Sequence, residues 1–217
     1  MKEETKKRLF LLFIVCAVWI CIWGFIIESK KEKRENDNIQ EENTKQEIQG
    51  TKMTVEQIEE FNVFFQDTRI NGFMNHTYDQ VKNINIKELL YDGAGIGEPM
   101  TKEEYTYLME TKYDGVDIGM DSLKFKKEAI SEFYTKYTEE KLEGNVGGIN
   151  LTYCEKYDFY YHMHGDTHMV DIQCIDGVID EQGYHHISYL QGEQTYTIVL
   201  KKEEDGNYIF IFNTKNT

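Results

Sequence analysis

The feature that most constrains this chain is an uncharged apolar run near its start. Residues 9–27 read LFLLFIVCAVWICIWGFII, nineteen residues without a charged side chain. At about 1.5 Å per residue, a helix of this length spans the roughly 30 Å hydrocarbon core of a bilayer. Trp19 and Trp23 lie toward its C-terminal side, where aromatic belts are common. The run predicts a single transmembrane anchor with the lipid bilayer as its partner.

A cleaved signal sequence is the alternative to an anchor. The apolar run exceeds the ~7–15 residues of a signal core, and no small-x-small cleavage site follows it. Basic residues flank both ends in equal number, so the positive-inside rule alone does not decide the orientation. Lys6, Lys7 and Arg8 abut the run directly, whereas glutamates dilute the basic residues after it. We therefore expect residues 1–8 in the cytoplasm and the C-terminal domain outside it, at the cell membrane.

The rest of the chain is strongly acidic and divides into a stalk and one domain. Residues 28–53 are almost entirely polar without a sustained heptad, which predicts a solvated stalk. Residues 54–217 have the size of one ordinary domain. From residue 35 onward, 16 Lys/Arg face 35 Asp/Glu, a formal charge of −19. Such a domain is repelled by phosphate backbones, so no nucleic acid partner is expected. A basic protein, a cationic ligand or a metal ion stays open.

Helix signals dominate the first part of the domain. Two capping boxes, Thr54 with Gln57 and Thr101 with Glu104, predict helix starts. The first helix carries an apolar stripe at helical spacing, made of Val55, Ile58, Phe61 and Phe65. A third helix is predicted over residues 122–138, with one apolar side made of Phe125, Ala129, Phe133 and Tyr137. Between them, the glycines of DGAGIGEP at 92–99 alternate as in a flexible loop, without the strand and helix of a phosphate-binding motif.

From residue 151 the apolar period changes to two. The strands are predicted at roughly 155–164, 168–177, 184–190, 195–202 and 207–213, with glycine-containing turns between them. Short turns imply an antiparallel meander, because parallel strands need long crossovers. The fold class is therefore α+β, with helices followed by a curved antiparallel meander. By analogy, NTF2-like and cystatin-like folds curl such a sheet around helices.

The domain contains two cysteines, Cys154 and Cys174, beside two in the apolar run. A hairpin that turns at residues 165 and 166 would bring them close, although out of register. Two reduced thiols are favoured, and a disulfide stays open because the domain is expected outside the cytoplasm. The spacing does not match a thiolate zinc site.

One constellation has metal-ligand character: His162, His164, Asp166 and His168. On a strand, residues 162 and 164 share a face, and a tight turn would return His168 beside them. Three imidazoles and a carboxylate can bind zinc, and a zinc-bound water could attack an ester or an amide. The alternative is an ordinary half-solvated sheet face with a hairpin turn.

The same string resembles the HxHxDH signature of metallo-β-lactamase-type hydrolases but departs from it. Thr167 separates Asp166 from His168, and a simple meander lacks the strand–helix alternation of that family. No Gly-x-Ser-x-Gly, P-loop or dinucleotide fingerprint is present. The sequence therefore predicts no catalytic residue and no cofactor, with zinc as the alternative.

Three stretches, FNVFFQDTRINGFMNHTYDQ, LLYDGAGIG and YCEKYDFYYHMHGDT, resemble a group of small membrane-anchored proteins and lipoproteins from low-GC Gram-positive gut bacteria of the Clostridia type. The resemblance covers residues 54–213. That group has no assigned activity, so the resemblance implies a location and a fold but no catalytic residue.

Taken together, the patterns favour a membrane-anchored, non-catalytic envelope domain that binds a protein, peptide or small ligand through the concave side of its sheet. One alternative is a metal-dependent hydrolase that uses His162, His164 and His168. Another is an assembly subunit of an envelope secretion or conjugation complex, with an envelope protein as its partner.

Overall fold

The computed structural model describes residues 48–91, 93–117, 122–162 and 171–216. The chain divides into two compact units, residues 1–48 and 49–217, and the helices and strands described below belong to the second unit. The predicted anchor at 9–27 lies outside the described residues. Within the described ranges, no helix combines the length and the apolar character that crossing a bilayer requires.

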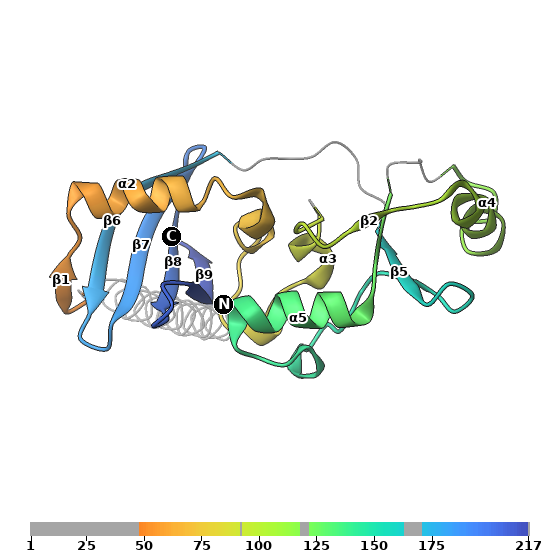
Figure 1. Cartoon of the computed structure of the whole chain (residues 1–217). Helices are drawn as coiled ribbons and strands as arrows, with labels where there is room; N and C mark the ends of the chain where they lie inside the picture. The colour runs from red at the N-terminus through yellow and green to blue at the C-terminus, as the bar shows by residue number, and fades with distance from the viewer. Residues whose placement is uncertain (1–47, 92, 118–121, 163–170, 217) are drawn as a thin grey trace, which may run out of the picture. The chain divides into compact units, whose positions relative to one another are not determined.

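A five-stranded antiparallel sheet carries helix α2 across one face (Figure 1). Its strands lie in the order β1-β6-β7-β8-β9, and α2 spans Val55–Phe64. The strand bounds are Gly50–Lys52, Ile172–Asp180, Tyr184–Gln191, Gln194–Lys202 and Tyr208–Lys215. Strands β6 to β9 form the predicted meander, so the α+β class with helices before an antiparallel sheet is confirmed.

The turns of the meander follow the glycine signals. Gly183, Gly192 and Gly206 each adopt a positive φ between neighbouring strands. L-residues other than glycine rarely adopt this conformation, so glycine determines where each strand ends. Local chemistry of this kind explains why the last three strands lie close to their predicted bounds.

Strand β1 extends the folded unit into the predicted stalk. Gly50 to Lys52 pair with β6, and Met53 is buried beneath Gly177. A Cβ built on Gly177 would lie 2.5 Å from the sulfur of Met53, so the contact requires glycine there. Strand β1 thus lies within residues 28–53, the range predicted as a stalk. Backbone pairing at a sheet edge needs no apolar side chain, which is why the polar sequence gave no sign of this strand.

A second antiparallel sheet has the strand order β2-β3-β5-β4. The strand bounds are Glu98–Pro99 for β2, Leu123–Phe125 for β3, Thr152–Cys154 for β4 and Phe159–His162 for β5. On one face, Leu108 of α4 (Lys102–Thr111) packs with Cys154 and Tyr161. On the other face, Phe125 joins the main core, together with residues of α3 (Ile86–Leu89) and α5 (Lys127–Thr138).

The predicted hairpin between 155–164 and 168–177 is wrong. Strand β5 pairs with β3 and β4, whereas β6 pairs with β1 and β7, so the two belong to different sheets. Residues 163–170, which include the predicted turn, lie outside the described residues. An alternating pattern identifies a strand and its two faces but not its partner, and here the partners come from distant parts of the chain.

The helix predictions are confirmed in part. Both capping boxes form, with the threonine hydroxyl accepting the third backbone N–H of the helix and the Gln or Glu side chain accepting the threonine N–H. Val55, however, is 81% exposed and does not belong to the buried stripe of α2. The helix predicted from 122 begins at Lys127, because Leu123 to Phe125 form strand β3.

The main core is rich in aromatic rings. Phe61 and Phe64 of α2, with the C-cap residue Phe65, pack on Tyr189, Tyr208 and Phe210 of the sheet. Phe73, at the end of the 3-10 helix η1 (Thr68–Phe73), stacks on Phe210 with ring centroids 4.1 Å apart. Short 3-10 turns η2 (Val81–Asn83) and η3 (Leu142–Gly144) complete the connections.

Both domain cysteines are free thiols. Cys154 and Cys174 are buried in different sheets. Of the two alternatives left open by the sequence, the structure has the reduced pair.

Candidate functional site

The sheet face predicted to bind a ligand is occupied by the protein itself. The aromatic side chains of α2 cover the face formed by Ile187, Tyr189 and Phe210, which are fully buried. Burial of this kind is the main source of stability in a small domain and leaves no room for a ligand. The sheet face under α2 is therefore filled by the chain's own side chains, and a candidate site is sought elsewhere.

Of the predicted zinc ligands, the structure describes one. His162 lies on β5 opposite Leu123 and is 2% exposed. Its ring meets the ring of Tyr91 edge to face, with centroids 5.9 Å apart. His164, Asp166 and His168 lie outside the described residues. The described residues hold no group of three or more His, Cys, Asp or Glu side chains placed to bind a metal. The zinc hypothesis stays a prediction.

The remaining histidine pair of the meander is divided between the two faces of β7. His185 packs against Phe61 and Tyr208 beneath α2. His186 lies 2.9 Å from the carboxylate of Asp180 on the other face. Burial lowers the pKa of His185, which favours its neutral form.

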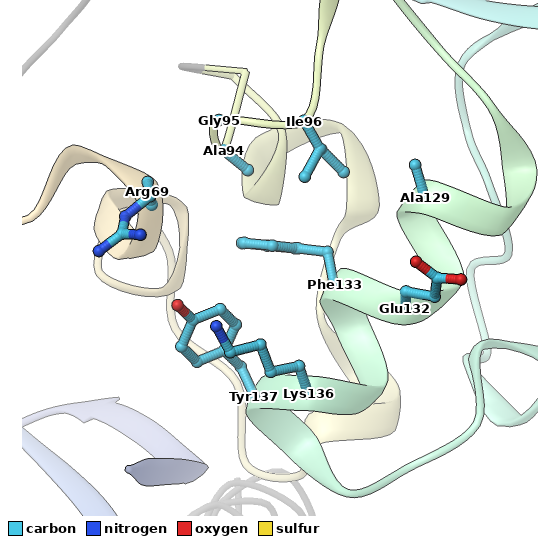
Figure 2. A pocket seen from close by; sticks show the side chains of 9 residues that line it. All are labelled: Arg69, Ala94, Gly95, Ile96, Ala129, Glu132, Phe133, Lys136 and Tyr137. Carbon is cyan, nitrogen blue, oxygen red and sulfur yellow. The ribbon is translucent and has the colours of Figure 1, made fainter.

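A pocket of about 300 Å³ lies between η1, the loop at residues 93–97 and one face of α5 (Figure 2). We call it the α5 pocket. Its lining residues are Arg69, Ala94, Gly95, Ile96, Ala129, Glu132, Phe133, Lys136 and Tyr137. The volume is at the lower end of the range for small-molecule sites. Apolar and aromatic side chains form its walls, and charged side chains stand at its edge.

Helix α5 supplies the longest wall of the α5 pocket. Its five lining residues follow the helical repeat from 129 to 137, so they form one face. Phe133 and Tyr137 are largely buried, whereas Glu132 and Lys136 of the same face are exposed. In Figure 2 the Phe133 ring projects from α5 toward the loop that carries Ala94 and Gly95. One helix face thus provides both the apolar floor and two charges of opposite sign.

The loop that closes the α5 pocket has an unusual backbone. Gly93, Ala94 and Gly95 have φ values of 78°, 49° and 71° in succession. For Ala94 this left-handed conformation costs roughly 1 kcal/mol or more, and such strain persists only where the surrounding structure enforces it. Ala94 is 3% exposed, so its methyl group is held inside by packing. Strained, buried loop residues are concentrated at binding sites in proteins.

Arg69 is held in place from two sides. Its Nε and Nη2 donate to the carboxylate of Asp67, the N-cap residue of η1. A Cβ built on Gly95 would lie 3.2 Å from Cγ of Arg69, so the loop runs close along the aliphatic stem. The hydrogen bonds from Arg69 hold the pKa of Asp67 below its usual range, and the same pair raises the pKa of Arg69. Both groups stay charged at neutral pH.

Lys136 is the second cation at this pocket. Its Nζ lies 4.9 Å from the centroid of the Tyr137 ring, within cation–π distance. Lys136 also contributes to the lowered pKa of Asp67, after the larger effect of the Arg69 hydrogen bonds. Arg69, Lys136 and Asp67 therefore act on one another across the mouth of the α5 pocket.

Sequence patterns indicate parts of this site. Phe133 and Tyr137 were predicted as an apolar helix face, and residues 92–99 as a loop, but nothing in the sequence brought the two together. Arg69 carried no motif at all. The glycine run was the one usable sign, because alternating glycines indicate close backbone approach.

Two other pockets show fewer features of a binding site. A pocket of about 210 Å³ borders His162 and is lined by Lys87, Tyr113 and Asn150 among others. A larger one, of about 400 Å³, lies beside Phe210 and Ile211 of β9. Neither is bordered by the strained segment at residues 93–95.

Comparison of this chain with models of protein families, with curated proteins and with solved structures gave no match.

Proposed function

We propose that this chain is a membrane-anchored, non-catalytic envelope domain that binds a small ligand or the end of a peptide in the α5 pocket. The apolar run at residues 9–27 supports the anchor, and the basic residues Lys6, Lys7 and Arg8 directly before it support an extracytoplasmic position of the domain. The observation that carries the binding role is the buried Ala94, held at a positive φ between two glycines beside Phe133 and Arg69.

The ionisation of the pocket supports binding in preference to acid–base chemistry. A general acid or base works best with a pKa near the working pH. The pKa of Asp67 is lowered and that of Arg69 is raised, so both move away from neutrality. Charges that persist at neutral pH orient a ligand but do not exchange protons with it.

The topology supports a cystatin-like assignment over an NTF2-like one. One strand, one helix and then four meander strands follow in the order β1, α2, β6, β7, β8 and β9, with residues 65–171 inserted after the helix. The helix packs across the sheet, as in that fold. A shared fold is compatible with many functions, so the assignment does not identify the ligand.

Ligand-observed NMR on the full chain in detergent micelles tests the binding role. A mixed set of small anionic, cationic and neutral aromatic fragments is screened against the protein. We expect binding by the unmodified chain and its loss in Ala129→Phe, where the new ring fills the α5 pocket.

Lys127→Phe is the matched control. It places the same ring on an exposed position of α5 that does not line the α5 pocket. Binding that survives in Ala129→Phe, or the absence of any bound fragment, would rule out the α5 pocket as the ligand site. Circular dichroism of both variants verifies that the fold is kept.

A further inference from the structure

The two cations at the α5 pocket, Arg69 and Lys136, lie on one side of it, apart from Glu132. Figure 2 shows the Arg69 guanidinium and the Lys136 amine on the Tyr137 side of the pocket, with the Phe133 ring between them and Glu132. Two acids act on these cations. The pKa of Asp205 is lowered mainly by its hydrogen bonds with Asn207 and also by Lys136, and Asp67 takes Nε and Nη2 of Arg69. The Nη1 group of Arg69 is not used in that pair.

A carboxylate partner that holds one edge of an arginine leaves its other N–H groups pointing in a defined direction. Asp67 offsets the charge of Arg69 but leaves Nη1 of Arg69 outside the pair. The Lys136 amine rests over the Tyr137 ring, which limits its range of positions. The cationic side thus offers hydrogen-bond donors from two cations within a domain that is otherwise strongly acidic.

The remaining walls are apolar. Ala94, Ile96, Ala129 and Phe133 surround the volume away from the cations. An apolar body against these walls gains from leaving water, at about 25 cal/mol per Å² of buried apolar surface. A volume of about 300 Å³ admits a body no larger than a small ring or a short chain.

Resting on the proposed binding role, we propose that the α5 pocket takes a small apolar carboxylate, with the carboxylate between Arg69 and Lys136 and the apolar body against Phe133. A free small acid and the C-terminal end of an apolar peptide share this chemistry. The acidic surface repels anions at long range, so the selectivity arises inside the pocket. Glu132 would favour a cationic amine instead, and that ligand class is the competing outcome.

Three probes with one apolar body separate these outcomes: phenylacetate, phenylacetamide and phenethylamine. Their dissociation constants are measured by ligand-observed NMR with the full chain in detergent micelles. We expect phenylacetate to bind at least tenfold more tightly than phenylacetamide, and phenethylamine to bind most weakly. An acetyl-capped dipeptide ending in phenylalanine, compared with its C-terminal amide, distinguishes a peptide end from a free acid.

Lys136→Met and Lys127→Met form the matched pair of variants. Each removes one positive charge from α5, but only Lys136 lines the α5 pocket. Lys136→Met is expected to weaken phenylacetate binding about tenfold and to leave phenylacetamide binding unchanged, whereas Lys127→Met leaves both unchanged. Equal losses in the two variants would attribute the effect to overall charge and overturn the proposal.

The outcomes also separate this proposal from the broader one. If the amide or the amine binds as tightly as the acid, and Ala129→Phe abolishes that binding, the α5 pocket is a ligand site but not one for carboxylates. If none of the probes responds to Ala129→Phe, the α5 pocket is not the site and both proposals fail.

Discussion

The two sheets of this domain are built on different principles. In the five-stranded sheet, β6 to β9 are long strands joined by short turns, and the sheet has an apolar interface with α2. The four-stranded sheet has strands of two to four residues, drawn from three distant stretches of the chain. Its second core, which includes Met100, Leu108, Cys154 and Tyr161, is small and surrounded by tyrosines.

The second sheet also contains a nearly buried ion pair. Glu104 of α4 accepts hydrogen bonds from Lys124 of β3 at 2.9 Å and from the Tyr161 hydroxyl at 2.9 Å. The two charged side chains are 5% and 12% exposed. The backbone N–H of Thr101 donates a further hydrogen bond to the Glu104 carboxylate. The four-stranded sheet is thus stabilised by polar interactions that require accurate geometry, whereas the five-stranded sheet is stabilised by the burial of apolar surface.

The difference predicts an asymmetry in stability. Phe125 of the second sheet packs into the main core, so this sheet depends on that core along one face. The ion pair lies on the opposite face, toward α4. Damage to the main core should therefore unfold both sheets, while damage to the ion pair should loosen the second sheet alone.

The largest effect is expected from Phe210→Ala. Phe210 is fully buried and stacked on Phe73, so the cavity should lower the free energy of unfolding by about 3–5 kcal/mol. Urea denaturation measures this loss, and hydrogen exchange should rise in both sheets. Val63→Ala, at an exposed position of α2, is the control and should change stability by less than about 0.5 kcal/mol. If hydrogen exchange rose in the five-stranded sheet alone, the four-stranded sheet would not depend on the main core.

Lys124→Met should have the next largest effect. It leaves the Glu104 carboxylate buried without its cation, at a cost of about 3 kcal/mol. Lys112→Met is the matched control, because Lys112 pairs with the exposed Glu155 and should cost less than about 1 kcal/mol. We expect faster hydrogen exchange in β3 and β5 with unchanged exchange in β7 and β8. If hydrogen exchange rose equally in both sheets, the two sheets would not differ in how they are stabilised.

The two free thiols report on the sheets separately. At urea concentrations below the main transition, Cys154 of β4 should react with iodoacetamide at least tenfold faster than Cys174 of β6, a difference of about 1.4 kcal/mol in opening free energy. Burial raises the pKa of the Cys174 thiol to about 12, which further slows its reaction in the folded state. Mass spectrometry of the labelled peptides measures both rates. Equal rates would mean that the two sheets open as one unit.

Acid should produce the smallest effect. Burial alone would raise the pKa of Glu104, but hydrogen bonds from Thr101, Lys124 and Tyr161 outweigh it and lower this pKa below its ordinary 4.5. A lowered folded-state pKa contributes stability that is present above pH 4.5 and lost as the pH falls through the folded value. The protection factors of β3 and β5 against hydrogen exchange, which correct for the slower intrinsic exchange in acid, should therefore fall below pH 4.5. In Glu104→Gln this fall should disappear, and its persistence would assign it to another group.

The structure also separates what short stretches of sequence can reveal from what they cannot. Thr54 with Gln57, and Thr101 with Glu104, located two helix starts, because a capping box is closed within four residues. Glu104, however, was read as a cap residue only. Its contact with Lys124 and Tyr161 joins residues 20 and 57 positions away, and no local pattern carries that information.

The candidate site divides in the same way. Phe133 and Tyr137 were recognised as an apolar helix face and residues 92–99 as a loop, since both follow from spacing and glycine content. Arg69 was not recognised, because its position depends on Asp67 and on the approach of Gly95 from a separate segment. Site residues that come together only in the folded structure have no characteristic spacing in the sequence.

The sequence by itself determined the α+β class, the helix caps and the turns of the last strands, because each of these depends on hydrogen bonds and φ values of neighbouring residues. The tertiary structure decided which strands pair with β5, which face of the sheet α2 covers and where Arg69 and Lys136 lie. Those outcomes depend on which distant surfaces bury each other most completely, a property of the whole chain.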